Sequence, residues 1–88
     1  MSRIGYTIEY GENARSNFKK FPKNIQERII RAIEERLAIT PEIGKPLIKE
    51  WKDHRRIRVG NYRVIYKVFE EKVIVFIVEI DHRKDVYE

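Results

Sequence analysis

The sequence contains no cysteine, and this absence excludes several kinds of site. Without cysteine the chain can form no disulfide bridge, no thiolate nucleophile and no zinc site that uses cysteine ligands. Its two histidines, His54 and His82, are isolated and do not have the spacing of metal ligands. We therefore expect a protein that holds no metal and no cofactor. Its stability must come from packing, unless a partner chain adds to it.

Long hydrophobic runs are also missing. The longest apolar run, residues 73–78, is too short to cross a bilayer, and the first twenty residues carry charges throughout, unlike a signal peptide. The chain shows no internal repeat, low-complexity segment or linker, and its length suits one domain, residues 1–88. Together with the missing cysteines, these absences predict a single-domain cytoplasmic protein with no membrane partner.

Positive charge is plentiful and unevenly placed. The formal net charge is +5, and the sequence pI is about 9.6. Residues 51–67 hold six basic residues against one acid, so this stretch alone carries the net charge of the whole chain. Such a patch indicates a polyanionic partner, with RNA or DNA ahead of an acidic protein. The alternative is a solvated strand surface that keeps the protein soluble. The six basic residues are Lys52, Arg55, Arg56, Arg58, Arg63 and Lys67.

The first half of the chain predicts one strand and two helices. Residues 4–10 alternate in the manner of a strand, and Gly11 ends it. Apolar residues then recur at helical spacing from about residue 12 to residue 20, and Pro22 is suited to open a second helix. That helix is the clearest element, because an apolar stripe runs along it at four-residue intervals: Ile25, Ile29, Ile33 and Leu37. Residues 40–46 are expected to form an irregular connection.

From Trp51 onward the pattern predicts three strands, at residues 56–59, 62–69 and 72–80. Gly60 and Asn61 suit a two-residue primed turn between the first two, and residues 70–71 are expected to turn the chain again. The last strand is apolar on both faces, as expected of an interior strand. The element order is β-α-α-β-β-β. It predicts an α+β domain in which a helix pair covers one face of an antiparallel sheet.

The turn fixes a register that brings arginines together. If residues 60–61 form a two-residue turn, Arg58 lies directly opposite Arg63, and both share with Arg56 the face that points away from the core. Two arginines in this position should destabilise a hairpin by about a few tenths of a kcal/mol. A phosphate bound between the guanidinium groups would relieve the repulsion. Alternatively, the side chains extend apart into water or meet acidic residues elsewhere in the fold.

The C-terminal segment adds groups that could transfer protons. Cleavage of RNA by attack of the 2′-OH needs a base, a proton donor for the departing 5′ oxygen and positive charge on the phosphate. Arginine can supply only the charge, because it stays protonated. Tyr87 and His82 are the candidates for proton transfer, and a tyrosine becomes a plausible base only beside several cations that lower its pKa. The alternatives are a packed aromatic ring for Tyr87 and a polar strand end for His82.

The stretch RRIRVGNYRVIYKV, followed after a short strand by DHRKDVYE, resembles the RelE/ParE toxin superfamily. The element order, the length and the basic charge agree, so the resemblance covers nearly the whole chain. It implies one of two activities on one fold. RelE-like members cut mRNA in the ribosomal A site without a metal and leave a 2′,3′-cyclic phosphate. ParE-like members inhibit DNA gyrase and generally lack the nuclease residues.

The residues that match the RelE pattern favour the nuclease. The resemblance assigns the scissile phosphate to Arg63 and Arg83, and the RNA backbone and the ionised tyrosine to Arg56 and Arg58. It makes Tyr87 the base. The best-studied RelE pattern has lysines at the positions of Arg56 and Arg58, so the proton donor stays open, with His82 or the arginine environment as candidates. The remaining residues expected to bind RNA are Lys52, Arg55 and Lys67.

The resemblance also implies partners. These are mRNA on the ribosome and a cognate antitoxin, whose acidic or amphipathic segment would lie on the basic domain. Two other readings stay open. A ParE-like gyrase inhibitor would act by binding, so its effect should survive loss of Arg63 and Tyr87. A non-catalytic RNA-binding module would show salt-dependent affinity for RNA and cut nothing.

Overall fold

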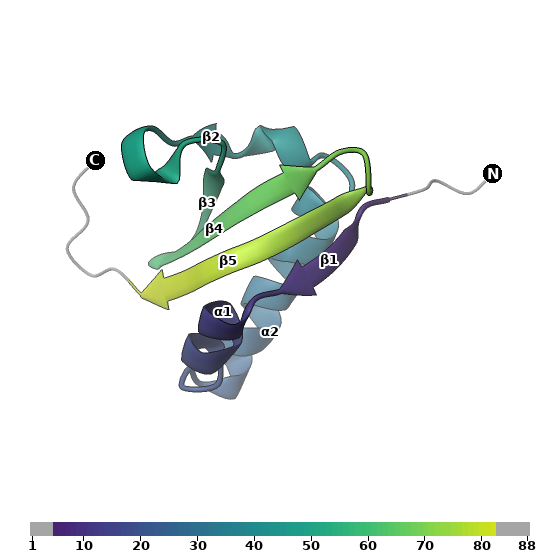
Figure 1. Ribbon diagram of the computed structural model, residues 1–88. Helices are drawn as coiled ribbons and strands as arrows, with labels where there is room; N and C mark the ends of the chain where they lie inside the picture. Colours follow the sequence, from purple (N-terminus) through teal and green to yellow (C-terminus); the bar gives the residue numbers. More distant parts are fainter. Residues whose placement is uncertain (1–4, 83–88) are drawn as a thin grey trace.

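The computed structural model describes residues 5–82, and its helices lie on one face of a five-stranded sheet (Figure 1). Helix α2 continues into a π-helical turn, Ile33–Leu37, and two short 3₁₀ turns, Pro41–Ile43 and Lys49–Trp51, flank the second strand. The predicted α+β class and the helix pair on one face are confirmed. The elements are β1 (Thr7–Tyr10), α1 (Glu12–Phe18), α2 (Lys23–Ala32), β2 (Lys45–Pro46), β3 (Arg55–Val59), β4 (Tyr62–Phe69) and β5 (Ile74–His82).

The strand order in the sheet is β1-β5-β4-β3-β2, so β5 is an interior strand as predicted. One part of the prediction was wrong. Strand β1 runs parallel to β5, with Thr7 beside Ile74 and Tyr10 beside Ile77, so the sheet is mixed and not wholly antiparallel. Both helices and three other strands separate β1 from β5 in the sequence, so no tight turn joins the two. A tight turn would have forced them to run antiparallel, whereas a long connection allows either direction.

The segment expected to be irregular contains a two-residue edge strand, β2. Lys45 pairs with Arg56 and Pro46 with Arg55. A proline is tolerated here because an edge strand needs hydrogen bonds on one side only. Strand β5 starts two residues later than predicted and ends two residues later, at His82. No helix within residues 5–82 has the length and apolar character needed to span a membrane.

The β3–β4 hairpin has the predicted register. Val59 pairs with Tyr62 and Arg58 with Arg63 across the two-residue turn. Gly60 has a φ of 63°, whereas Asn61 is not among the residues with positive φ. Positive φ at the first turn position alone fits a type II′ turn, which favours glycine there.

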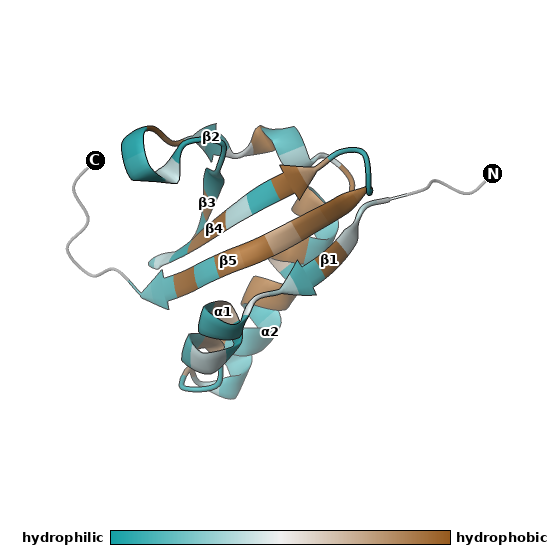
Figure 2. Ribbon diagram, viewed as in Figure 1, coloured by the Kyte–Doolittle hydropathy of each residue, from teal (hydrophilic) through white to brown (hydrophobic). Residues whose placement is uncertain are grey.

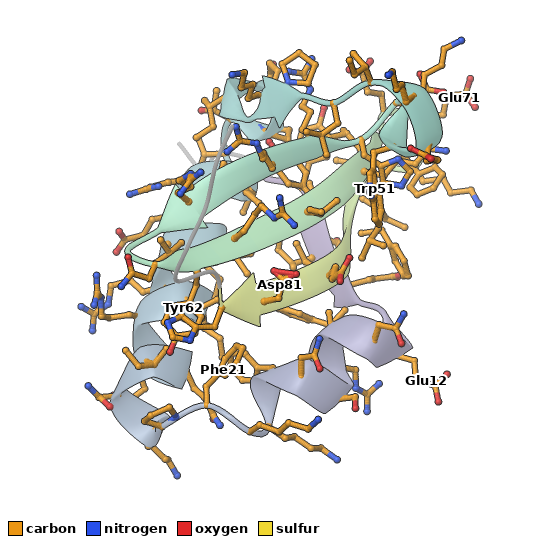
Figure 3. All side chains as sticks on the ribbon, turned by 90° about the vertical axis from the view of Figure 1, so that its left-hand side faces the viewer. Glu12, Phe21, Trp51, Tyr62, Glu71 and Asp81 are labelled. Carbon is orange, nitrogen blue, oxygen red and sulfur yellow. The ribbon has the colours of Figure 1, made fainter. Side chains whose placement is uncertain are left out.

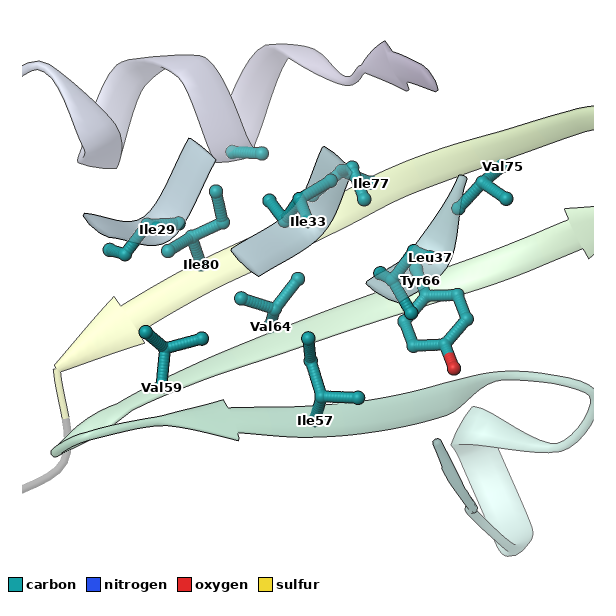
Figure 4. Close-up of a cluster of buried hydrophobic side chains, with 11 residues drawn as sticks. Ile29, Ile33, Leu37, Ile57, Val59, Val64, Tyr66, Val75, Ile77 and Ile80 are labelled. Carbon is teal, nitrogen blue, oxygen red and sulfur yellow. The ribbon is translucent and has the colours of Figure 1, made fainter. Parts of the chain in front are cut away.

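The core lies between the sheet and the helices. Figure 2 shows that β5, which contributes several of the core side chains, is largely apolar. The predicted stripe of α2 and its π-helical extension is confirmed, because Ile29, Ile33 and Leu37 are fully buried. Ile57 lies opposite Val64, as expected. The close-up in Figure 4 shows the side chains of Ile29, Ile33 and Leu37 facing those of β4 and β5. The cluster comprises Ala14, Ile29, Ile33, Leu37, Ile57, Val59, Val64, Tyr66, Val75, Ile77 and Ile80.

A buried tyrosine fixes the loop before β2. The Tyr66 hydroxyl donates a hydrogen bond to the Pro41 carbonyl at 2.6 Å and accepts one from the Gly44 amide at 2.9 Å. A Cβ atom on Gly44 would lie 2.1 Å from the hydroxyl oxygen, so only glycine fits beside it. Burial raises the pKa of Tyr66 above its ordinary value of 10.0. The neutral hydroxyl therefore holds residues 41–44 against β4.

Replacing Tyr66 by phenylalanine should lower the free energy of unfolding by about 1–3 kcal/mol, because the buried Gly44 amide and Pro41 carbonyl lose their partner. Urea unfolding measures the change. Tyr62→Phe is the control, since the Tyr62 hydroxyl makes no hydrogen bond to the residues that the structure describes. Equal losses in the two variants would contradict the account.

The same hydroxyl should make the fold sensitive to alkali. Its pKa is higher in the folded protein than in the unfolded chain, so its contribution is complete below pH 10 and is lost as the pH rises through the folded pKa. The unfolding free energy should therefore fall more steeply above pH 10 for the wild-type chain than for Tyr66→Phe.

Candidate functional site

Strand alternation gives the sheet a second surface, opposite the helices, which we call the outer face. Its side chains lie outside the core cluster, and they include most of the cations expected to bind RNA. Figure 3 shows all the described side chains and labels Asp81 among them. The outer face carries Arg56, Arg58, Arg63, Ile65, Lys67, Phe69, Ile74, Phe76, Glu79 and Asp81.

A β-bulge decides which end residues of β5 belong to this face. Ile65 pairs with Glu79 and Tyr66 with Ile77, so Val78 is an extra residue in β5. The bulge shifts the alternation by one position. Ile80 consequently points into the core, opposite Val64, and Asp81 points to the outer face.

Asp81 completes a row of three charged residues across β3, β4 and β5. Arg58 pairs with Arg63, and Arg63 pairs with Asp81. The Arg63 Nη2 atom lies 3.8 Å from Asp81 Oδ2, with side chains only 18% and 26% exposed. The other carboxylate oxygen of Asp81 is buried and accepts no hydrogen bond from residues 5–82. Arg63 therefore meets an acid on a neighbouring strand, which was one of the two alternatives to phosphate binding. This ion pair offsets the repulsion between Arg58 and Arg63.

A second row lies beside the first. Lys45 and Arg56 are neighbours on β2 and β3, and Ile65 and Glu79 continue the row on β4 and β5. Ile65 is only 2% exposed although it lies on the face opposite the helices. The aliphatic stems of long charged side chains can cover an apolar residue in this way while their charged ends stay in water. The outer face therefore contains a buried apolar residue between the charged residues Arg56 and Glu79.

His82 does not join the arginines, although the sequence made it a candidate for proton transfer. It pairs with Tyr62, and the two rings stack with centroids 4.6 Å apart and an angle of 21°. Tyr62 also contacts Phe21 of the helical layer, at 4.8 Å. An unbroken alternation from Phe76 would have put His82 on the outer face. The bulge reverses it, and the sequence carried no signal for the bulge.

The three other basic candidates lie in different places. Lys67 is on the outer face, and its Nζ atom is 5.2 Å from the centre of the Phe69 ring. Lys52 is exposed in the loop before β3, where it lines a groove of about 550 Å³ together with Lys67. Arg55 is on the helix side, opposite Tyr66. Its Nη1 atom donates to the carbonyls of residues 42 and 44 at 3.1 and 2.8 Å, so Arg55 anchors the loop before β2.

Two candidates fall outside the described residues. Arg83 and Tyr87 were assigned to the phosphate and to proton transfer, and those assignments stay predictions. Within residues 5–82 the structure brings together Arg56, Arg58 and Arg63, with Lys67 further along β4. Sequence reasoning missed Asp81, which directly follows a buried strand residue and was passed over in favour of the histidine beside it.

A helix pair on one face of a mixed five-stranded sheet is the fold that this chain shares with RelE-like toxins of known structure. The family model described as the ParE toxin of type II toxin–antitoxin systems matches residues 8–87. The chain belongs to this family, and it is therefore a toxin of the type II class. This confirms the superfamily that the sequence motifs indicated.

Individual relatives agree with this assignment. The chain is 32% identical over 83 residues to the toxin RelG of Mycobacterium tuberculosis, covering 93% of this chain and 95% of the relative. It is 25% identical to the mRNA interferase toxin RelE of Escherichia coli, covering 92% and 86%. Among solved structures it resembles the toxin–antitoxin complex RelBE2 of M. tuberculosis, with a TM-score of 0.86, 30% identity, and coverage of 96% of this chain and 98% of that one.

The Asp81→Asn substitution should lower the unfolding free energy by about 0.5–1 kcal/mol at low salt, because it removes the charge that offsets the two facing arginines. The loss should shrink at high salt, where the repulsion is screened. Urea unfolding at two salt concentrations measures it. Glu71→Gln, the same charge change in the exposed β4–β5 turn, should have little effect. A loss that is equal in both variants and insensitive to salt would contradict the role of the ion pair.

Proposed function

We propose that the chain is a metal-independent endoribonuclease that cuts mRNA in the ribosomal A site. The observation that carries this proposal is the pair of facing arginines on the outer face, Arg58 and Arg63, with Arg56 two residues from Arg58 on the same strand. A cluster of guanidinium groups suits a phosphate in both charge and donor geometry. The relative from E. coli, which is named an mRNA interferase, supports RNA as the source of that phosphate.

The proposed reaction is attack of a ribose 2′ oxygen on the adjacent phosphorus. The bond from phosphorus to the 5′ oxygen breaks, and a 2′,3′-cyclic phosphate remains. Negative charge grows on the phosphate oxygens in the transition state, and fixed cations in a partly desolvated site stabilise it. Arg63 supplies this charge in the proposal. Asp81 holds its side chain, since the two groups form a half-buried ion pair. Arg56 and Arg58 bind the neighbouring RNA backbone.

Proton transfer is assigned to Tyr87. Several cations close to a phenol lower its pKa, so the arginines would keep Tyr87 ionised and able to take the 2′ proton. Arg83 is the second cation on the scissile phosphate in the proposal. His82 lies on the other face of the sheet from Arg63 and stacks on Tyr62, so it takes no part in proton transfer. The departing 5′ oxygen then takes its proton from water beside the arginines.

The proposed protein partner is a cognate antitoxin. The similar structure from M. tuberculosis, RelBE2, is that of a toxin–antitoxin complex. A basic outer face is suited to an acidic or amphipathic segment that would cover the arginines and exclude RNA. Such a partner would inhibit the toxin by occupying the site itself.

The test is cleavage of mRNA on programmed bacterial ribosomes, with the ends mapped by primer extension. The purified chain should cut within the A-site codon. Arg63→Ala should slow cleavage by about 10²- to 10³-fold, the usual effect of removing one group that stabilises an oxyanion, and Tyr87→Phe should also abolish rapid cleavage. Arg31→Ala is the matched control, because Arg31 is an exposed arginine on α2 and should leave the rate unchanged.

A second candidate is inhibition of DNA gyrase, which the ParE name of the matching family favours. An inhibitor that acts by binding would leave mRNA intact on active ribosomes and would block supercoiling equally well after Tyr87→Phe. That result would replace the nuclease proposal. Intact mRNA and unaffected gyrase, together with salt-dependent RNA affinity, would instead support a non-catalytic RNA-binding module.

A further inference from the structure

The outer face has an apolar part that neither the core nor the proposed chemistry uses. Phe69, Ile74 and Phe76 lie at the end of the sheet away from Asp81, and we call them the apolar stripe. Phe69 is 38% exposed, and the other two are half-buried. Phe69 pairs with Ile74 across β4 and β5. Figure 2 shows that β5 is hydrophobic along most of its length. Exposed aromatic area of this kind is unfavourable in water unless a ligand covers it.

Cations of the outer face lead directly to this stripe. Lys67 is directly opposite Phe76 on the neighbouring strand, and its Nζ atom lies over the ring of Phe69. Arg63 precedes Lys67 by four residues on the same face of β4, a distance of about 13 Å at the usual rise of a strand. Cationic and aromatic side chains therefore follow one another along β4, from the facing arginines to the stripe.

The local backbone accommodates the Phe76 ring. A Cβ atom placed on Gly11 would lie 2.9 Å from the end of that ring, so the ring rests against the glycine at the end of β1. The absence of a side chain at Gly11 lets the ring lie close to the sheet. Phe76 is thus held in place by the strand beside it and still keeps part of its surface exposed.

The charges on the outer face are divided between two sides, and this division would orient a bound ligand. Strands β3 and β4 contribute cations: Arg56, Arg58, Arg63 and Lys67. Strand β5 contributes Phe76 and the acids Glu79 and Asp81, and Glu9 of β1 lies beside Phe76. Phosphates are attracted to the first side and repelled from the second. A ligand with phosphates along one edge and flat apolar groups along the other fits this division, and single-stranded RNA has that structure.

We propose that Phe69 and Phe76 form a stacking platform for unpaired bases of the substrate RNA, with Lys67 binding the phosphate between the platform and the facing arginines. The backbone of the strand then runs over β3 and β4, and its bases point toward β5. This inference rests on the proposed function in that RNA is the ligand, and it adds a second contact region away from the scissile phosphate. Stacking on aromatic rings tolerates any base, so the platform adds affinity without fixing sequence.

The first test uses the full chain and a short single-stranded 2′-O-methyl RNA, which cannot undergo attack by a 2′-OH. Fluorescence anisotropy gives its affinity. Phe69→Ala and Phe76→Leu should each weaken binding by about 5- to 100-fold, with the salt dependence unchanged. Lys67→Ala should reduce the slope of log affinity against log salt by about one. Ile48→Ala is the control, because Ile48 is an apolar residue 74% exposed in the loop after β2, and this variant should bind like the wild type.

The second test removes bases from the RNA. An abasic residue at the stacked position should weaken binding to the wild-type chain and should have no further effect on Phe76→Leu, since the two changes remove the same contact. Phe69→Ala provides the same comparison at an exposed position, and thermal unfolding checks that each variant is folded. Additive effects in both variants would overturn the proposal.

The outcomes separate this inference from the proposed function. Cleavage on ribosomes together with wild-type RNA affinity in the phenylalanine variants would overturn the platform alone. Coupling between the rings and the abasic residue, without cleavage, would support the platform and reject the nuclease. Phenylalanine variants that keep full RNA affinity but lose affinity for the cognate antitoxin would overturn the platform and identify a protein interface.

Discussion

One extra residue in β5 determines how the rest of the sheet is used. Val78 has no partner of its own on β4, and the alternation of side chains reverses at that point. Before the bulge, Val75 and Ile77 fill the core, and after it Ile80 does so. Without the shift, Ile80 would point away from the helices, and Asp81 would have to enter the core. The bulge therefore keeps the core apolar to the end of the strand and delivers a carboxylate to the facing arginines.

The two faces of the sheet differ in chemistry: one packs against the helices, and the other carries charged side chains. The helix side is closed by packing and by the hydrogen bonds that Tyr66 and Arg55 make to the loop before β2. The outer face carries charge: cations come from β3 and β4, and acids come from β5 and β1. Because the strands are hydrogen-bonded neighbours, this separation of charge is fixed by the register of the hairpin and the bulge. A polyanion that binds to the outer face would therefore place its negative charges over β3 and β4 and away from β5 and β1.

Much of this could be predicted from the sequence, because strong local patterns carried it. The stripe of α2 gave the helix that covers the sheet, and Gly60 gave the register that sets Arg58 opposite Arg63. The direction of β1 could not be predicted, since periodicity shows that a strand exists but does not show which way it runs. The bulge was equally hidden, because the apolar run around Val78 suits either alternation. His82 was a candidate because of its proton-transfer chemistry, and the sequence did not show that the bulge places it on the helix side and Asp81 on the outer face.

We propose that the outer face binds RNA through its arginines. The most direct measurement is a nuclear magnetic resonance titration of the arginine side-chain Nε–H signals with a single-stranded RNA that cannot be cleaved. We expect the signals of Arg58 and Arg63 to shift first and together and that of Arg56 to follow, whereas the signal of Arg31 on α2 stays unchanged. Shifts confined to the helix arginines, with Arg58 and Arg63 unaffected, would contradict this proposal.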